Sequence, residues 1–299
     1  MASSACKPPR YAATAETVSL RLRLMRLCGR YCRMTPCAEG CNSRPIQTNR
    51  LRSCGRRSRR PSHRRVAVAA AFAAGDTRKA VTVLDIEAYK AAFLTIRDGM
   101  SQTEFSNNIT AAFRKLGYSG GASVQIGIYS ALPHGSITPQ TIREGDVVMV
   151  DGGTSCEGYA SDITRTFVVG KANKRQTEVW NVEKKAQDAA FAAIKIGAPC
   201  EQVDAAARAV IEQAGFSKNY KLPGLPHRTG HGIGLEGHEW TNFVKGNKTP
   251  IAVGMCFSNE PTISIPGEFG IRLEDCLYIS EEGPRFFSKQ SISIDQPFG

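Results

Sequence analysis

Five residues with metal-binding side chains occur at intervals through the second half of the sequence. They follow the order Asp151, Asp162, His231, Glu260 and Glu274. Each lies in or beside a segment that is predicted to be a strand. Carboxylate oxygens and imidazole nitrogens are ligands for hard or borderline divalent cations. The series is therefore a candidate metal-binding set.

Histidine is concentrated in two short segments. Of the five histidines, His134 falls in ALPHG, and His227, His231 and His238 fall in LPHRTGHGIGLEGHE. Glycine and proline punctuate both segments, as is typical of loops and strand ends. This local use of imidazole indicates a site.

The charge of the five-residue set favours two cations over one. Four carboxylates and one neutral imidazole carry a formal charge of −4, which two divalent ions would balance. Such ions lie ~3.5–4 Å apart and share a water or hydroxide, which becomes the nucleophile. We expect Asp162 and Glu274 to bridge, Asp151 to chelate one ion, and His231 and Glu260 to complete the other. An oxygen-rich shell favours Mn²⁺, with Co²⁺ or Zn²⁺ as alternatives.

Each of these residues also has an ordinary interpretation. Taken singly, Asp151 is a turn former at a strand end, and Glu260 before a proline is a surface acid. Asp162 could serve only as an ion-pair partner for Arg165. That interpretation leaves the other acids unexplained, so the joint pattern favours a site.

Alternating apolar residues predict the strands that hold the first two acids. SVQIGIYS alternates Val124, Ile126 and Ile128, a buried run at 147–150 ends at Asp151, and a strand at 163–169 follows Asp162. Three glycines in the intervening GGTSCEGYAS predict a hairpin. If the two aspartates are directly opposed, their Cβ atoms lie ~5 Å apart.

A further strand is predicted around the last acid. In IRLEDCLYI, alternation places Arg272, Glu274, Cys276 and Tyr278 on one face. Asp275 then points to the other face and is not expected to be a ligand.

An internal repeat predicts the architecture. Residues 91–99 align with 189–197, and 105–118 with 203–216, at a constant offset of 98 residues. Each copy reads as a helix, a break containing glycine and a second helix, followed later by a His-Gly pair. In the first copy, Ser101 and Glu104 form a capping-box signal, and an apolar stripe begins at Phe105 and closes at Gly117. These features predict an α+β fold with a pseudo-twofold repeat.

Composition divides the chain into a basic segment, 1–78, and a catalytic domain, 79–299. Residues 1–75 hold 16 of the 39 Lys and Arg but only two of the 27 acids. Such an Arg-rich stretch is typical of an organellar transit peptide, and a disordered extension or a misplaced start is the equal alternative. The balanced remainder argues against nucleic-acid binding, and no apolar run is long enough to span a membrane. Four scattered cysteines in the remainder are typical of buried thiols, so we expect a location in the cytoplasm or an organelle matrix.

The motifs DGGTSCEGYASDITRTF, PHRTGHGIGLEGHE, FSNEPTI and IRLED resemble those of the pita-bread metallopeptidases, which include Xaa-Pro aminopeptidases, prolidases, methionine aminopeptidases and creatinase. The resemblance covers roughly residues 80–299. It implies that Asp151, Asp162, His231, Glu260 and Glu274 are the metal ligands. It also implies that His134 is an active-site histidine, and that His238 contacts the scissile carbonyl or the developing anion.

His227 and Arg272 match positions typical of the Xaa-Pro branch and imply roles in substrate binding. The expected substrates are small peptides with proline in second position. Glu260 or a nearby histidine is expected to move the proton to the leaving nitrogen. The expected assembly is a homodimer. Relatives carry a further N-terminal domain that residues 1–75 do not resemble. A methionine aminopeptidase is the first alternative. The second is a non-catalytic binding protein of the same fold whose basic segment contacts RNA or a partner.

Overall fold

The computed structural model describes residues 77–299. Residues 1–76, which make up nearly all of the predicted basic segment, lie outside the described range. The boundary at residue 78 and the location of the protein therefore stay predictions. Among the described helices, none is both long and apolar enough to cross a bilayer.

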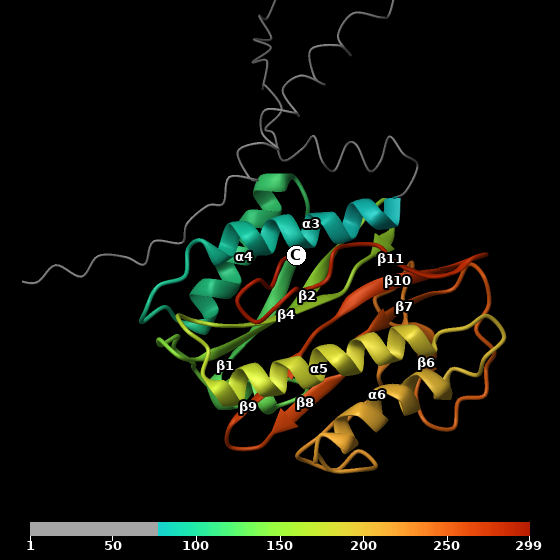
Figure 1. Ribbon diagram of the computed structural model, residues 1–299. Helices are drawn as coiled ribbons and strands as arrows, with labels where there is room; N and C mark the ends of the chain where they lie inside the picture. The colour runs from blue at the N-terminus through green and yellow to red at the C-terminus, as the bar shows by residue number, and fades with distance from the viewer. Residues whose placement is uncertain (1–76) are drawn as a thin grey trace, which may run out of the picture. The chain divides into compact units, whose positions relative to one another are not determined.

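The first half of the described chain is a helix pair packed against an antiparallel sheet (Figure 1). Its elements are α3 (Thr77–Phe93), α4 (Gln102–Leu116), β1 (Gly120–Ile126), the 3₁₀ turn η1 (Gly127–Ala131), β2 (Val147–Cys156), β3 (Tyr159–Ala160) and β4 (Ile163–Val168). Strand β2 pairs with both β1 and β4. The predicted hairpin forms, because β2 turns into β3 at Glu157 and Gly158, which both have positive φ.

The second half repeats this plan with a helix pair and a five-stranded sheet. Its elements are α5 (Lys174–Ala193), α6 (Glu201–Gln213), β5 (Gly230–Gly232), β6 (Glu239–Phe243), β7 (Cys256–Asn259), β8 (Thr262–Ile265), β9 (Phe269–Arg272), β10 (Asp275–Ser280) and β11 (Gly283–Phe286). The strand order is β11-β10-β7-β5-β6, and β8 and β9 form a separate hairpin. In Figure 1, α5 and α6 lie on the side of these later strands.

The repeat predicted from the sequence extends to backbone geometry. Gly117 and Gly215, one offset apart, both end a helix with φ of 94°. Gly99 and Gly197 donate to the carbonyls of Ile142 and Ile251 across equivalent connections. Left-handed conformations at matching places favour glycine in both copies. The predicted pseudo-twofold α+β organisation is therefore present.

Helix α4 begins and ends as its sequence indicates. The Ser101 hydroxyl accepts a hydrogen bond from the Glu104 amide, while the Glu104 carboxylate pairs with Arg97 at 2.7 Å. The apolar stripe of Phe105, Ile109, Phe113 and Leu116 is buried. It joins one of two main apolar clusters, which also includes residues of α3, β1, β2 and β4. The other cluster serves α5, α6 and the later strands.

The register corrects one expectation about the first two acids. Asp151 lies opposite Thr164, so Asp162, two residues earlier, is its diagonal neighbour instead of its direct partner. The register follows from the two-residue turn at Glu157 and Gly158, which pairs Cys156 with Tyr159 and, further along β2, Asp151 with Thr164. The parity of the strand keeps both acids on one face.

The predicted strand at the last acid is interrupted. Arg272 ends β9, where it is paired with Thr262 of β8, and Asp275 begins β10, where it is paired with Asn259 of β7. Glu274 lies between the two strands, because the chain changes partners there. Asp275 does point away from Glu274, as predicted, and its carboxylate binds Arg165 at 2.7 Å. The interpretation of Asp162 as the partner of Arg165 is therefore wrong.

Replacing Asp275 by alanine is expected to destabilise the protein strongly. Both Asp275 and Arg165 are fully buried, and removing one partner leaves the guanidinium uncompensated, at a cost of about 3–5 kcal/mol. Urea unfolding of the metal-free protein measures this. Asp98→Ala, which removes the exposed partner of Arg143, is the matched control and should cost less than about 1 kcal/mol. Equal stability of the two variants would contradict the assignment.

Candidate metal centre

The four acids and the imidazole, separated by up to 123 positions in the sequence, converge at one place. Asp151 comes from β2, Asp162 precedes β4, His231 lies in β5, Glu260 follows β7, and Glu274 joins β9 to β10. Their ligand atoms form overlapping groups in which all atoms lie within 4.8 Å of one another: Asp151, Asp162 and Glu274; and His231, Glu260 and Glu274. Both halves of the fold therefore contribute to one cluster.

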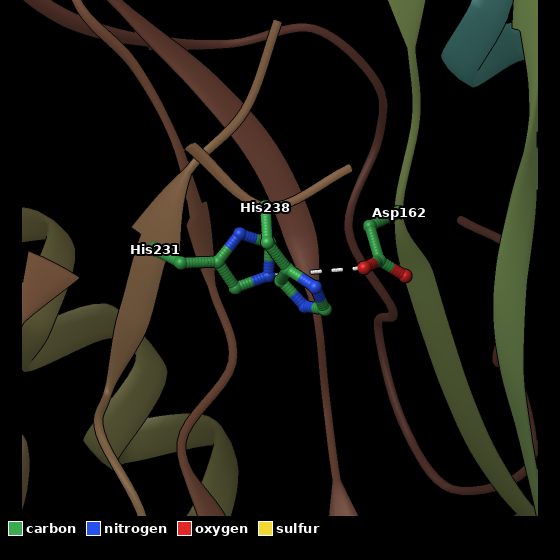
Figure 2. A group of neighbouring side chains, drawn as sticks. All are labelled: Asp162, His231 and His238. Carbon is green, nitrogen blue, oxygen red and sulfur yellow. Dashed lines mark ion pairs between the residues drawn. The ribbon is translucent and has the colours of Figure 1, made fainter. Parts of the chain in front are cut away.

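His231 presents a lone pair to the carboxylates. Its Nδ1 lies 2.9 Å from the carbonyl oxygen of Gly232, which can only accept, so Nδ1 carries the proton. Its Nε2 faces oxygens of Glu260 at 3.4 Å, Asp162 at 3.7 Å and Glu274 at 3.9 Å. Figure 2 shows the ring directed towards Asp162. Burial lowers the pKa of His231 to about 3, so the imidazole is neutral.

The carboxylates repel one another in the absence of a cation. Burial and, after it, the charge on Asp151 raise the pKa of Asp162 to about 8. Burial likewise raises the pKa of Glu260 to about 7 and shifts that of Glu274 upward. Crowded carboxylates either take up protons or bind cations.

The donor set fits divalent cations. A neutral imidazole nitrogen and several carboxylate oxygens face the same small volume, and Nε2 carries no proton because Nδ1 holds it. Glu274 Oε1 is buried and has no hydrogen-bond partner among the described residues. An orphaned buried oxygen beside a lone pair is the arrangement that a bound cation satisfies. Glu274 belongs to both groups, which suits a bridging position.

The cavity of about 600 Å³ over this cluster is lined by the other residues predicted to act. His238 stacks edge-on against His231, with ring centroids 4.3 Å apart, and it forms a third group with Asp162 and His231. Figure 2 places its ring beside Asp162. His134, on the loop after η1, is exposed at the wall of the cavity and is not part of the cluster.

Both ring nitrogens of His227 are already engaged by the protein. Nδ1 donates to the carbonyl of Arg228 at 2.7 Å, so Nε2 accepts from the Thr262 hydroxyl at 2.9 Å. Burial lowers the pKa of His227 to about 3. The ring therefore offers the cavity a neutral surface instead of a free donor.

Arg272 is held by the cluster itself. Its guanidinium pairs with the Asp151 carboxylate and donates from Nε to the Thr164 hydroxyl at 3.2 Å. The side chain is buried but still contributes to the cavity wall. It therefore offsets part of the negative charge of the cluster while lying within reach of the cavity.

Sequence reasoning missed three residues that contact the cluster. The Thr164 hydroxyl lies 2.7 Å from Glu274 Oε2 and 2.9 Å from Asp151 Oδ1, and so connects acids from the two halves. Ser258 accepts from the His231 amide at 3.1 Å, and Arg228 lies 4.0 Å from Glu260. Thr164 could have been found, because a residue two positions after Asp162 on a strand shares its face. The contacts of Arg228 and Ser258 have no such local signal.

Comparison with known proteins agrees with this geometry. Residues 77–281 match the family described as metallopeptidase family M24. A Xaa-Pro dipeptidase of Lactobacillus helveticus is 37% identical over 205 residues, which cover 67% of this chain and 54% of the relative. A probable dipeptidase PepE of Mycobacterium bovis is 40% identical over 210 residues, covering 69% and 54%.

Solved structures give the same picture. The Xaa-Pro dipeptidase from Bacillus anthracis superposes with a TM-score of 0.66 at 35% identity, covering 71% of this chain and 59% of that one. The pita-bread fold predicted from the sequence is thereby confirmed. The chain spans about half the length of the curated relatives it matches.

Thr164→Val is expected to weaken binding of Mn²⁺ by about 10- to 100-fold, because it removes the hydroxyl shared by Asp151 and Glu274 while keeping the side-chain shape. Isothermal titration calorimetry of the metal-free protein measures the affinity. Thr164→Ser retains the hydroxyl and should bind like the unaltered protein. A valine variant with undiminished affinity would refute a role for this hydroxyl.

The metal-free protein is expected to lose stability as the pH rises from 6.5 to 8. The pKa values of Glu260 and Asp162, raised by burial to about 7 and about 8, make the folded state bind more protons than the unfolded state. The stabilisation is therefore present at low pH and is lost as pH passes these values. The lowered pKa values of His227 and His231, about 3, make stability increase with pH, but only below their unfolded pKa of 6.5. They therefore do not affect the trend between pH 6.5 and 8.

Scanning calorimetry in chelator and in excess Mn²⁺ tests this pH dependence. The melting temperature should fall across the window in chelator. It should hold or rise with Mn²⁺, because the cation binds the ionised carboxylates. A flat profile in chelator is the contrary result.

Proposed function

Because the chain belongs to metallopeptidase family M24, we propose that it is a metal-dependent peptidase that hydrolyses the bond between an N-terminal residue and proline. The observation that carries the proposal is the complete cluster of four carboxylates and a neutral imidazole beneath a cavity. The names of the relatives, Xaa-Pro dipeptidase and prolidase, supply the substrate class.

We assign Asp151, Asp162, His231, Glu260 and Glu274 as ligands of two divalent ions, most favourably Mn²⁺ because oxygen donors dominate. When bound, such ions lower the pKa of a shared water so that it attacks a carbonyl at neutral pH. Asp162 and Glu274 would be the carboxylates shared by both ions, since each belongs to two of the groups of converging ligand atoms and a carboxylate offers two oxygens. The Thr164 hydroxyl fixes the carboxylates around this pair.

His238 and Glu260 complete the chemistry at the cavity side of the cluster. His238 is exposed beside His231, and we assign it the stabilisation of the oxyanion that develops on the scissile carbonyl. Glu260 lines the cavity, and we assign it the transfer of a proton to the leaving proline nitrogen. That nitrogen gains one proton as the amide bond breaks and leaves as the secondary amine of proline, since the Xaa-Pro amide has no N–H.

Substrate recognition is assigned to the remaining wall of the cavity. The neutral ring of His227, the guanidinium of Arg272, His134 and Pro133 all line the cavity. We propose that His227 and Arg272 contact the proline residue of the substrate, and that His134 contacts the substrate near the scissile bond. A homodimer remains the assembly we propose.

The proposal is tested with Mn²⁺-loaded protein on Ala-Pro, Ala-Pro-Ala and Met-Ala-Ser. Release of alanine from one or both of the first two is expected, and it distinguishes dipeptidase from aminopeptidase action. Asp162→Asn should lower kcat/KM by more than about 100-fold, because it removes a ligand instead of an outer partner. Asp98→Asn, at an exposed acid, is the matched control and should be fully active. Cleavage of Met-Ala-Ser alone would identify a methionine aminopeptidase instead.

A further inference from the structure

The correspondence between the two halves, at an offset of 98 residues, begins earlier in the chain than the match at residues 91–99. Val81 and Val179, Ala88 and Ala186, and Ala92 and Ala190 are each one offset apart, and all six side chains are buried. Helices α3 and α5 therefore turn corresponding stripes towards their respective sheets (Figure 1).

Polar residues on these stripes also correspond. Tyr89 of α3 and Gln187 of α5 are one offset apart, and both are almost completely buried. One turn earlier, Asp85 and Glu183 are likewise one offset apart and fully buried. A polar side chain is seldom placed in a helix–sheet core without a partner. The carboxylates of Asp85 and Glu183 have no hydrogen-bond partner among the described residues. Tyr89 and Gln187 do have partners, and their matching positions indicate a shared task.

Tyr89 and Gln187 each donate to a main-chain carbonyl beside one acid of the cluster. The Tyr89 hydroxyl donates to the carbonyl of Ile163 at 3.1 Å, next to Asp162 in the chain. The Gln187 amide donates to the carbonyl of Leu273 at 3.2 Å, next to Glu274. Each helix is thus tied to the main chain beside one of the two acids assigned as bridging.

Gln187 is also tied to the segment before Glu260. The Asn259 amide donates to the main-chain carbonyl of Gln187 at 2.9 Å, and the Gln187 amide donates to Asp275 at 3.0 Å. The residues that flank Glu260 and Glu274 therefore share one anchor on α5. This anchor fixes the peptide planes from which those carboxylates project.

We propose that Tyr89 and Gln187 are equivalent positioning residues that set the separation of the Asp162 and Glu274 carboxylates, and hence the affinity of the metal pair. The inference rests on the proposed function, since it takes these two acids as bridging ligands. A bridging carboxylate contacts both ions, so loss of either anchor weakens both binding steps. Outer partners of metal ligands typically contribute about 10- to 100-fold in affinity.

The test compares Tyr89→Phe and Gln187→Met by calorimetric titration of the metal-free protein with Mn²⁺. Phenylalanine retains the ring that packs edge-on against Phe113 and loses only the hydroxyl. Both variants should bind at least about 10-fold more weakly in each of two steps. If Gln187→Met does not fold, Tyr89→Phe decides the question alone.

The control separates positioning from general stability. Gln176, also buried on α5, donates its amide to the carbonyl of Gly145 at 2.8 Å, away from every candidate ligand. Gln176→Met should lower the melting temperature of the metal-free protein without changing either Mn²⁺ affinity. Unchanged affinities in Tyr89→Phe, or an equal loss in Gln176→Met, overturn the inference while leaving the peptidase proposal intact. Absence of Mn²⁺ binding by the unaltered protein overturns both.

Discussion

The structure depends on the concentration of negative charge around one neutral imidazole. Asp151, Asp162, Glu260 and Glu274 converge with His231 where burial disfavours ionisation and each charge disfavours the next. Arg272 and Arg228 offset only part of this charge. Cations between the carboxylates would relieve the repulsion and satisfy the orphaned oxygen of Glu274. The residues of the site therefore account for a metal requirement without reference to any relative.

The fold meets this constraint by bringing two similar halves together. Each half buries a helix pair against a sheet and delivers part of the cluster from strand ends. Contacts between the halves fix the junction: Thr164 joins Asp151 to Glu274, and Arg165 crosses to Asp275. Tyr89 and Gln187 support the same acids from behind. Carboxylates held this firmly keep their spacing despite repulsion, which is the condition for binding a pair of ions.

Sequence reasoning performed well where the signal was local. The stripe of α4, its caps at Ser101 and Gly117, the β2–β3 hairpin and the direction of Asp275 away from Glu274 followed from periodicity and turn chemistry, and the structure agrees. The second half of the capping box does not form, because the Glu104 carboxylate binds Arg97. It failed where partners came from elsewhere. The register puts Thr164 opposite Asp151 because strand pairing is set by the whole hairpin, and the strand around Glu274 breaks because it changes partners between β8 and β7.

The sequence by itself determined the identity of the candidate ligands, the repeat of helices and glycines, and the likeness to the pita-bread metallopeptidases, since these are properties of residue type and spacing. Tertiary structure alone decided that Arg272 binds Asp151, that both nitrogens of His227 are occupied, and that Thr164 lies between two acids. Apart from the bond of His227 to Arg228, these contacts join residues 13 to 121 positions apart in the chain. Such contacts are set by packing in space, which no local pattern encodes.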